Sequence, residues 1–197
     1  MMTDKQQQEL EKMMSGDLYD ATNNTTLLDL LTQTQEMCHD YNLLRPSQTA
    51  ERTALMRRIL GKTGQRFKII SPFFCDYGFN IEVGENFFAN FNLVILDEAR
   101  VTFGDNVFIA PNCAFYTAGH PLDVAQRNAG LEYSLPIRVG NNVWIGGNVC
   151  VMPGVTIGDN TVIGAGSVVV HDIPAGVLAA GNPCRVIRQL DATETCR

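Results

Sequence analysis

Aliphatic residues recur at every sixth position through the C-terminal part of the chain. The unbroken series consists of Val139, Ile145, Val151, Ile157, Ile163 and Val169, and a glycine follows four of its members. Six is a multiple of the two-residue repeat of a β-strand, whereas a helix would scatter the same residues around its circumference. The pattern therefore predicts short strands that each point one aliphatic side chain inward, with glycine allowing the tight corner that follows.

Three such hexads would close one triangular coil of about 18 residues, and stacked coils would bury a continuous column of aliphatic side chains. Burying each Val or Ile is worth about 1.5–3 kcal/mol, which offsets the cost of ordering a glycine-rich chain. The same period appears upstream in two fragments, Val83, Ala89, Ile95 and Phe103, Ile109, Phe115. A β-sandwich, whose turns are spaced less regularly by about 8–12 residues, fits this pattern less well.

The period fails after Phe115. The positions where it would next place inward aliphatic residues hold Pro121, Arg127 and Tyr133. Residues 117–136 are therefore expected to leave the coil as a projecting loop, and long loops in compact folds are frequently functional. This loop contains His120, one of three histidines in the chain. Histidine is the usual general base near neutral pH, although a lone histidine is more often structural or merely exposed.

The first 60 residues are predicted to be helical. A first helix ends near Gly16, a second begins at Thr26 and ends before Pro46, and a third covers residues 49–60. Two capping boxes are expected to open the first and second helices, Thr3 with Gln6 and Thr26 with Asp29. These helices by themselves indicate no chemistry.

Composition and charge exclude several classes of function. The chain is 45% hydrophobic, and its formal net charge is −6 with no long run of Lys or Arg, so a packed core is expected and a nucleic-acid partner is not. No apolar run reaches the roughly 18 residues of a membrane-spanning helix, and the N-terminus lacks the layout of a secretory signal. Six scattered cysteines without metal-ligand spacing indicate reduced thiols and no metal site. We therefore expect a cytoplasmic protein.

Four longer stretches are more specific than the repeat itself. They are CDYGFNIEVGENFFANFN (75–92), TAGHP (117–121), RNAGLEY (127–133) and NNVWIGGNVCVMPGVTIGDNTVIGAGSVV (141–169). In this order, and with GDLYD near the N-terminus, they closely resemble the hexapeptide-repeat sugar O-acetyltransferases of the maltose/galactoside/nodulation-factor group. The resemblance implies a mainly β fold, a left-handed parallel β-helix, with an N-terminal helical cap over 1–64, the acetyltransferase domain over 65–185 and a C-terminal tail over 186–197.

The same resemblance implies a chemistry. Family members transfer an acetyl group from acetyl-CoA to a sugar hydroxyl in a ternary complex, need no metal or permanently bound cofactor, and form homotrimers with active sites between subunits. His120 matches the family's general base. The backbone N–H of Gly147 matches a position near the thioester, where a prepositioned donor stabilises the tetrahedral oxygen.

Further residues match the family's two substrate sites. Asp76, Asn90 and Glu98 match acceptor positions, although galactoside enzymes carry a shorter acidic residue in place of Glu98, and Asp76 and Asn90 could instead cap coil corners. The residues on CoA positions are Gly147, Ala165, Val170, His171, Arg185 and Arg188. The guanidinium groups suit phosphates, whereas family members often carry Thr-Lys in place of Val170-His171.

Three alternatives share the repeat. A hexapeptide acetyltransferase acting on serine, an antibiotic or an amino sugar would have the same coils. A metal-dependent hydratase would need three histidines per zinc from adjacent coils, and only His120 is suitably placed. A non-catalytic scaffold would show an uninterrupted repeat, which the failure of the period over 117–136 opposes.

Overall fold

The computed structural model describes residues 4–191, and its first three helices precede the coils. These are α1 (Asp4–Ser15), α2 (Thr25–Leu43) and α3 (Thr49–Ile59). The Asn24 side chain caps α2 by accepting hydrogen bonds from the N–H groups of Thr26 and Leu27, so the capping box predicted at Thr26 is wrong. The box predicted at Thr3 lies outside the described residues. No helix in the described part of the chain is long and apolar enough to cross a bilayer.

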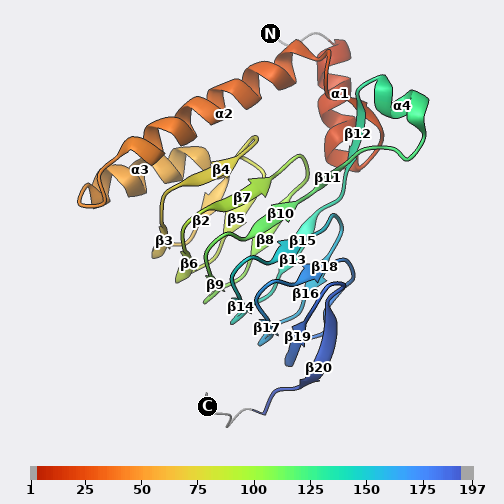
Figure 1. The fold of residues 1–197 in the computed structure, drawn as a ribbon. Coiled ribbons are helices and arrows are strands. Elements are labelled where there is room, and N and C mark those ends of the chain that lie inside the picture. The colour runs from red at the N-terminus through yellow and green to blue at the C-terminus, as the bar shows by residue number, and fades with distance from the viewer. Residues whose placement is uncertain (1–3, 192–197) are drawn as a thin grey trace.

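The following strands form a three-sided parallel β-helix, in which consecutive strands lie on successive faces (Figure 1). The first face contains β2 (Lys62–Thr63), β5 (Ile81–Val83), β8 (Val101–Phe103), β13 (Ile137–Val139) and β16 (Thr156–Ile157). The second contains β3 (Phe67–Ile69), β6 (Phe87–Ala89), β9 (Phe108–Ile109), β14 (Trp144–Ile145), β17 (Val162–Ile163) and β19 (Val177–Ala180). The third contains β4 (Phe73–Cys75), β7 (Leu93–Leu96), β10 (Ala114–Tyr116), β15 (Cys150–Val151) and β18 (Val168–Val169). The last strand, β20 (Arg185–Gln189), pairs antiparallel with β19.

The coils have two lengths. Away from the cap, Val139 pairs with Ile157 eighteen residues later, as three hexads predict. Near the cap, Ile95 pairs with Cys75 and with Phe115, each twenty residues away, so a uniform 18-residue coil is wrong there. The chain turns three times in each coil. We call the turn from the first face to the second the first corner, the turn from the second face to the third the second corner, and the turn from the third face back to the first the third corner. The two additional residues lie at the third corner.

A continuous column of apolar side chains fills the prism, as the repeat predicts. The inward residues of the hexads between Val83 and Val169 are at most 4% exposed. In the coils near the cap the column is aromatic, and the ring of Phe103 lies 5.1 Å from that of Phe87 and 5.0 Å from that of Phe115. Edge-to-face and tilted contacts at this distance add to the stabilisation from burial.

At the first corner, asparagine rather than glycine adopts the left-handed backbone conformation. Four asparagines there have φ between 55° and 57°, and their side chains hydrogen-bond from coil to coil: Asn86, Asn106, Asn142 and Asn160. The glycines after the inward residues serve close approach instead. A Cβ on Gly84 would lie 2.4 Å from the carbonyl oxygen of Gly104 in the next coil. The sequence analysis expected these glycines to allow the tight corner, but in the structure they let neighbouring coils pack closely.

Residues 117–136, which we call the excursion, leave the coil as predicted, but they are structured. They form β11 (Ala118–Gly119), α4 (Val124–Asn128) and β12 (Leu131–Ser134). β12 pairs antiparallel with β11 and also with β1 (Tyr19–Asp20) from the cap. Figure 1 shows this sheet beside α1, and the Ser134 hydroxyl donates a hydrogen bond of 2.7 Å to the carbonyl of Met13. The cap therefore holds the excursion in place.

Candidate active site

Polar residues gather at the third corner of the coils near the cap. Asp76 follows β4, Glu98 lies two residues after β7, and His120 lies in the excursion that follows β10. Because β4, β7 and β10 are neighbours on the third face, their ends stack above one another. The structure thus brings these three predicted residues to one corner, the corner where these coils carry their additional residues.

Asp97 is a buried carboxylate at this corner that the sequence analysis missed. Its Oδ1 accepts hydrogen bonds from the N–H groups of Asp76 (3.1 Å) and Tyr77 (2.8 Å), while its Oδ2 has no partner among the described residues. Burial raises the pKa of Asp97 to about 7, and the charge of Asp76 adds to this shift. Asp97 therefore fixes the backbone that carries Asp76. Its signal in the sequence was its place beside Glu98.

Asp76 and Glu98 form a hydrogen-bonded pair of carboxyl groups. Burial raises the pKa of both, and the hydrogen bond and charge of Asp76 raise the pKa of Glu98 further, whereas the same hydrogen bond lowers that of Asp76. The hydrogen bond between the two groups therefore favours the proton on Glu98 over Asp76. Thr117 Oγ1 lies 3.2 Å from Glu98 Oε2. A pair of carboxyl groups that share a hydrogen bond suits a ligand rich in hydroxyl groups.

The raised pKa of Glu98 makes stability depend on pH. Between the pKa of Glu98 in the unfolded chain, about 4.3, and its higher value in the fold, the folded state binds a proton that the unfolded state releases. The free energy of unfolding should therefore fall as the pH rises from 5 to 8. We expect Glu98→Gln to flatten this fall by about 1–3 kcal/mol, measured by urea unfolding across the pH range. Glu36→Gln, at an exposed position of α2, is the control, and equal slopes in all three proteins would contradict the assignment.

His120 projects from the hairpin of β11 and β12, and its side chain is 56% exposed. Its Nδ1 lies 3.4 Å from the carbonyl oxygen of Leu131, and its Nε2 lies 3.7 Å from Oε1 of Glu132. When the neutral ring carries its proton on Nδ1, Nε2 keeps a lone pair that can accept a proton from a substrate. The contact with Leu131 fixes the orientation of the ring from one side, and a ring held in this way is able to accept a proton.

Glu132 and Tyr19 are two further residues that the sequence analysis missed. The hydroxyl of Tyr19 donates a hydrogen bond of 2.8 Å to Oε2 of Glu132, and Tyr19 is 1% exposed. Burial and the charge of Glu132 raise the pKa of Tyr19, so the phenol stays a neutral donor. The cap is thereby linked through Glu132 to the imidazole of His120.

The remaining predicted site residues lie elsewhere on the prism. At the second corner of their coils lie Asn90, Gly147 and Ala165. At the third corner of the last coil lie Val170 and His171, and on β20 lie Arg185 and Arg188. Within one chain, the width of the third face separates the second corner from the corner that carries His120. A single chain therefore does not bring the imidazole and Gly147 together.

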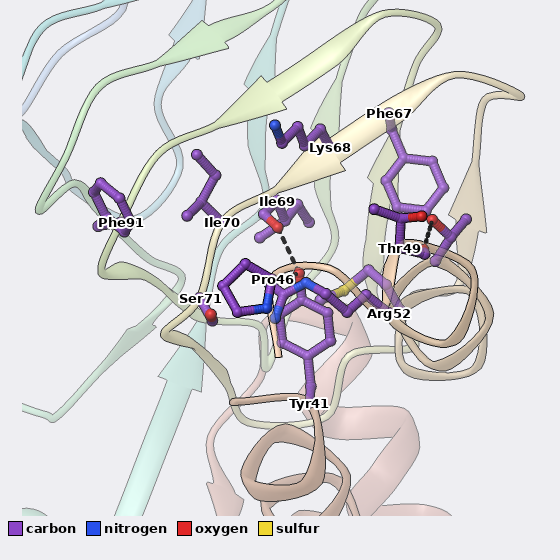
Figure 2. A pocket seen from close by; sticks show the side chains of 12 residues that line it. Tyr41, Pro46, Thr49, Arg52, Phe67, Lys68, Ile69, Ile70, Ser71 and Phe91 are labelled. Carbon is purple, nitrogen blue, oxygen red and sulfur yellow. Dashed lines mark hydrogen bonds between the residues drawn. The ribbon is translucent and has the colours of Figure 1, made fainter. Parts of the chain in front are cut away.

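Two cavities open beside the cap. The larger, of about 590 Å³, lies between α3 and β3, and no predicted site residue lines it. Figure 2 shows that Tyr41 and Arg52 are paired there, because Arg52 Nη2 donates to the Tyr41 hydroxyl (2.9 Å) and that hydroxyl donates to the carbonyl of Ile69. The smaller, of about 490 Å³, lies between α2 and the third face and has Asp76 in its wall. The smaller cavity is the one that shares a lining residue with the polar corner.

Stacked hexapeptide coils with a structured, histidine-bearing excursion define the class of hexapeptide-repeat transferases. Residues 136–171 match the bacterial transferase hexapeptide (six repeats), and residues 12–64 match the maltose acetyltransferase hexapeptide capping motif. The two matches cover the coils below the excursion and most of the helical cap.

Individual relatives are similar over most of their length. The chain is 53% identical over 189 residues to YJL218W of Saccharomyces cerevisiae, a candidate acetyltransferase (94% of this chain, 96% of the relative), and 49% identical over 155 residues to galactoside O-acetyltransferase of Escherichia coli (79% and 76%). A maltose O-acetyltransferase from Clostridium difficile 630 superposes with a TM-score of 0.91 at 46% identity, covering 93% and 97%. A galactoside acetyltransferase in complex with coenzyme A gives 0.87 at 44%, covering 92% and 90%. The chain belongs to this family of hexapeptide-repeat O-acetyltransferases and is an acyltransferase, which confirms the predicted family and enzyme class.

Proposed function

We propose that this chain transfers the acetyl group of acetyl-CoA to a hydroxyl of a sugar, in a ternary complex with His120 as the general base. The observation that carries the proposal is the third corner, where a half-exposed imidazole and a hydrogen-bonded pair of carboxyl groups share one site. Relatives named for maltose and galactoside acetylation, and a related structure that holds coenzyme A, support both substrates.

The reaction begins when Nε2 of His120 takes the proton of the acceptor hydroxyl as that oxygen attacks the thioester carbonyl. The carbonyl of Leu131 orients the ring through Nδ1, and the Glu132 carboxylate stabilises the imidazolium that forms. The tetrahedral intermediate then collapses with cleavage of the carbon–sulfur bond. The imidazolium returns its proton to the thiolate of CoA, which leaves the acetylated sugar and free CoA as products.

Gly147 is the proposed donor to the tetrahedral oxygen. Its N–H donates no hydrogen bond within residues 4–191, although the N–H groups of its neighbours Gly146 and Asn148 bond to the carbonyls of Ile163 and Pro111. An unpaired backbone N–H at a corner is the kind of prepositioned donor that stabilises a developing oxyanion. Because Gly147 and His120 lie on different corners, the proposed site combines His120 of one copy with Gly147 of another.

The outward surfaces of the prism support a homotrimer. The first face presents a polar row, Glu82, Thr102, Arg138 and Thr156, whereas the second presents Phe88, Phe108, Trp144, Val162 and Leu178, and the third presents Val94, Ala114, Cys150 and Val168. Phe108 and Trp144 are each 50% exposed. An exposed apolar face fits a neighbouring copy, and copies that repeat one head-to-tail contact close into a ring. Three copies in such a ring would bring the third corner of each, with His120, beside the second corner of the next, with Gly147.

The same assembly accounts for the predicted CoA residues. Gly147 and Ala165 line the second corner of one copy, while Val170 and His171 line the third corner, so a groove between copies can use both sets. The exposed Arg185 on β20 suits a phosphate of CoA. The five cysteines in the described part of the chain are free thiols, which fits the proposed cytoplasmic location.

Asp76→Ala tests the acceptor site. We expect the KM for the sugar to rise by roughly tenfold, because a hydrogen-bond acceptor is lost, while the KM for acetyl-CoA stays the same. The measurement is release of the CoA thiol from acetyl-CoA with a panel of glucosides, galactosides and maltose. Asp29→Ala, at an exposed position of α2, is the control. Turnover with serine or amino sugars and with no simple sugar would overturn the proposed function, and an unchanged KM would remove Asp76 from the site.

A further inference from the structure

The 490 Å³ cavity between α2 and the third face is not used by the chemistry at the corner. We propose that it is a second acceptor subsite, which holds the second sugar ring of a disaccharide whose first ring lies against Asp76 and His120. The inference rests on the proposed function, because it assumes a sugar acceptor at the third corner. Its volume falls within the range of about 300–1,000 Å³ that small-molecule sites occupy.

One wall of the cavity is apolar and aromatic. It is formed by Pro72, Phe74 and Leu96. Phe74 points outward from the third face and is 50% exposed. The C–H face of a pyranose is apolar and packs on the face of an aromatic ring, where it removes apolar surface from water. An exposed phenylalanine beside the polar corner therefore provides a platform for a ring rather than for a charged group.

The opposite wall, on α2, offers unused polar groups. Gln35 and His39 are four residues apart and therefore lie on the same side of the helix. Neither side chain forms a hydrogen bond within the described part of the chain, whereas their neighbour Asn42 is fully engaged, because it bonds at 2.9 Å to both the N–H and the carbonyl of Phe73. Gln35 and His39 are thus free to bond the hydroxyl groups at the rim of a sugar ring.

Asp76 connects the cavity to the reacting corner. It lines the cavity and is also hydrogen-bonded to Glu98, so a ligand that contacts Asp76 at the corner lies next to the cavity. The larger cavity of Figure 2 has no such link, since no corner residue lines it. The smaller cavity therefore has the position, the aromatic platform and the free polar groups that a second ring requires.

The test compares maltose with glucose in the full-length enzyme. We expect Phe74→Ala to lower kcat/KM for maltose by at least about fivefold and to leave that for glucose within about twofold, so the ratio of the two falls. His39→Ala should lower the same ratio by about threefold or more. Phe91→Ala removes a ring of equal exposure, 50%, from outside this cavity and should leave the ratio unchanged. The size of the assembly is measured for every variant by light scattering.

The outcomes separate the subsite from the proposed function. If both sugars lose activity equally, or if neither variant changes the ratio, the second subsite is wrong while the sugar acetyltransferase stands. If the wild-type enzyme acetylates neither of these sugars nor any glucoside or galactoside of the panel, the proposed function is wrong, and calorimetry of maltose binding to the CoA-loaded enzyme then decides the subsite. Weaker binding of maltose to Phe74→Ala than to wild type would support the subsite, and equal binding would overturn it.

Discussion

Replacement of His120 by alanine is expected to lower kcat by at least about 10²-fold, with little change in the affinity for CoA. The methyl group of alanine cannot take the proton of the acceptor hydroxyl, and Glu132, 3.7 Å from Nε2, is engaged by the Tyr19 hydroxyl. Single-turnover kinetics with saturating acetyl-CoA would measure the chemical step, and calorimetry with CoA would measure binding.

Leu122→Ala is the matched control, because Leu122 lies in the same excursion and is 94% exposed. It should retain kcat within about twofold, since exposed residues away from special features contribute little. A His120→Ala enzyme that keeps more than about a tenth of the wild-type kcat would contradict the assignment of the base. A large loss in Leu122→Ala as well would show that the fold of the excursion, rather than the imidazole, had been measured.

The repeat predicted the architecture because its period is a local property of the chain. Inward residues such as Ile145 and Val151 appear in the sequence at the spacing at which they appear in space. The handedness of the coil is a different matter, because general rules favour right-handed crossovers and only the family resemblance implied the left-handed sense. The role predicted for glycine was also wrong. Gly84 avoids a clash with the next coil, and a contact between coils cannot be read from the neighbouring residues in the sequence.

The site was predicted where it interrupts the pattern and missed where it depends on distant contacts. His120 was found because the period fails around it. Asp97 lies where the inward residues Ile95 and Phe103 are eight rather than six positions apart, so that spacing was a signal for the third corner. Tyr19 reaches Glu132 through the pairing of β1 with β12, more than 100 positions along the chain, and no local pattern encodes such a contact.

Phe115→Ala should cost about 3–5 kcal/mol of the free energy of unfolding, because it removes a fully buried aromatic ring from a column that cannot collapse around the gap. The ring lies 5.0 Å from that of Phe103, and its strand pairs with Ile95 on one side and Val151 on the other. Each neighbouring coil is held by its own hydrogen bonds, so the cavity stays open.

Urea unfolding at one fixed protein concentration would measure this loss, because an assembly makes apparent stability depend on concentration. Phe79→Ala, whose ring is 42% exposed at the third corner, should cost about 1 kcal/mol or less. A loss below about 1.5 kcal/mol for Phe115→Ala would mean that the coil stack tolerates a cavity. Phe115 lies two residues before Thr117, where the excursion begins, so the column that this substitution weakens is the one from which the excursion with His120 departs.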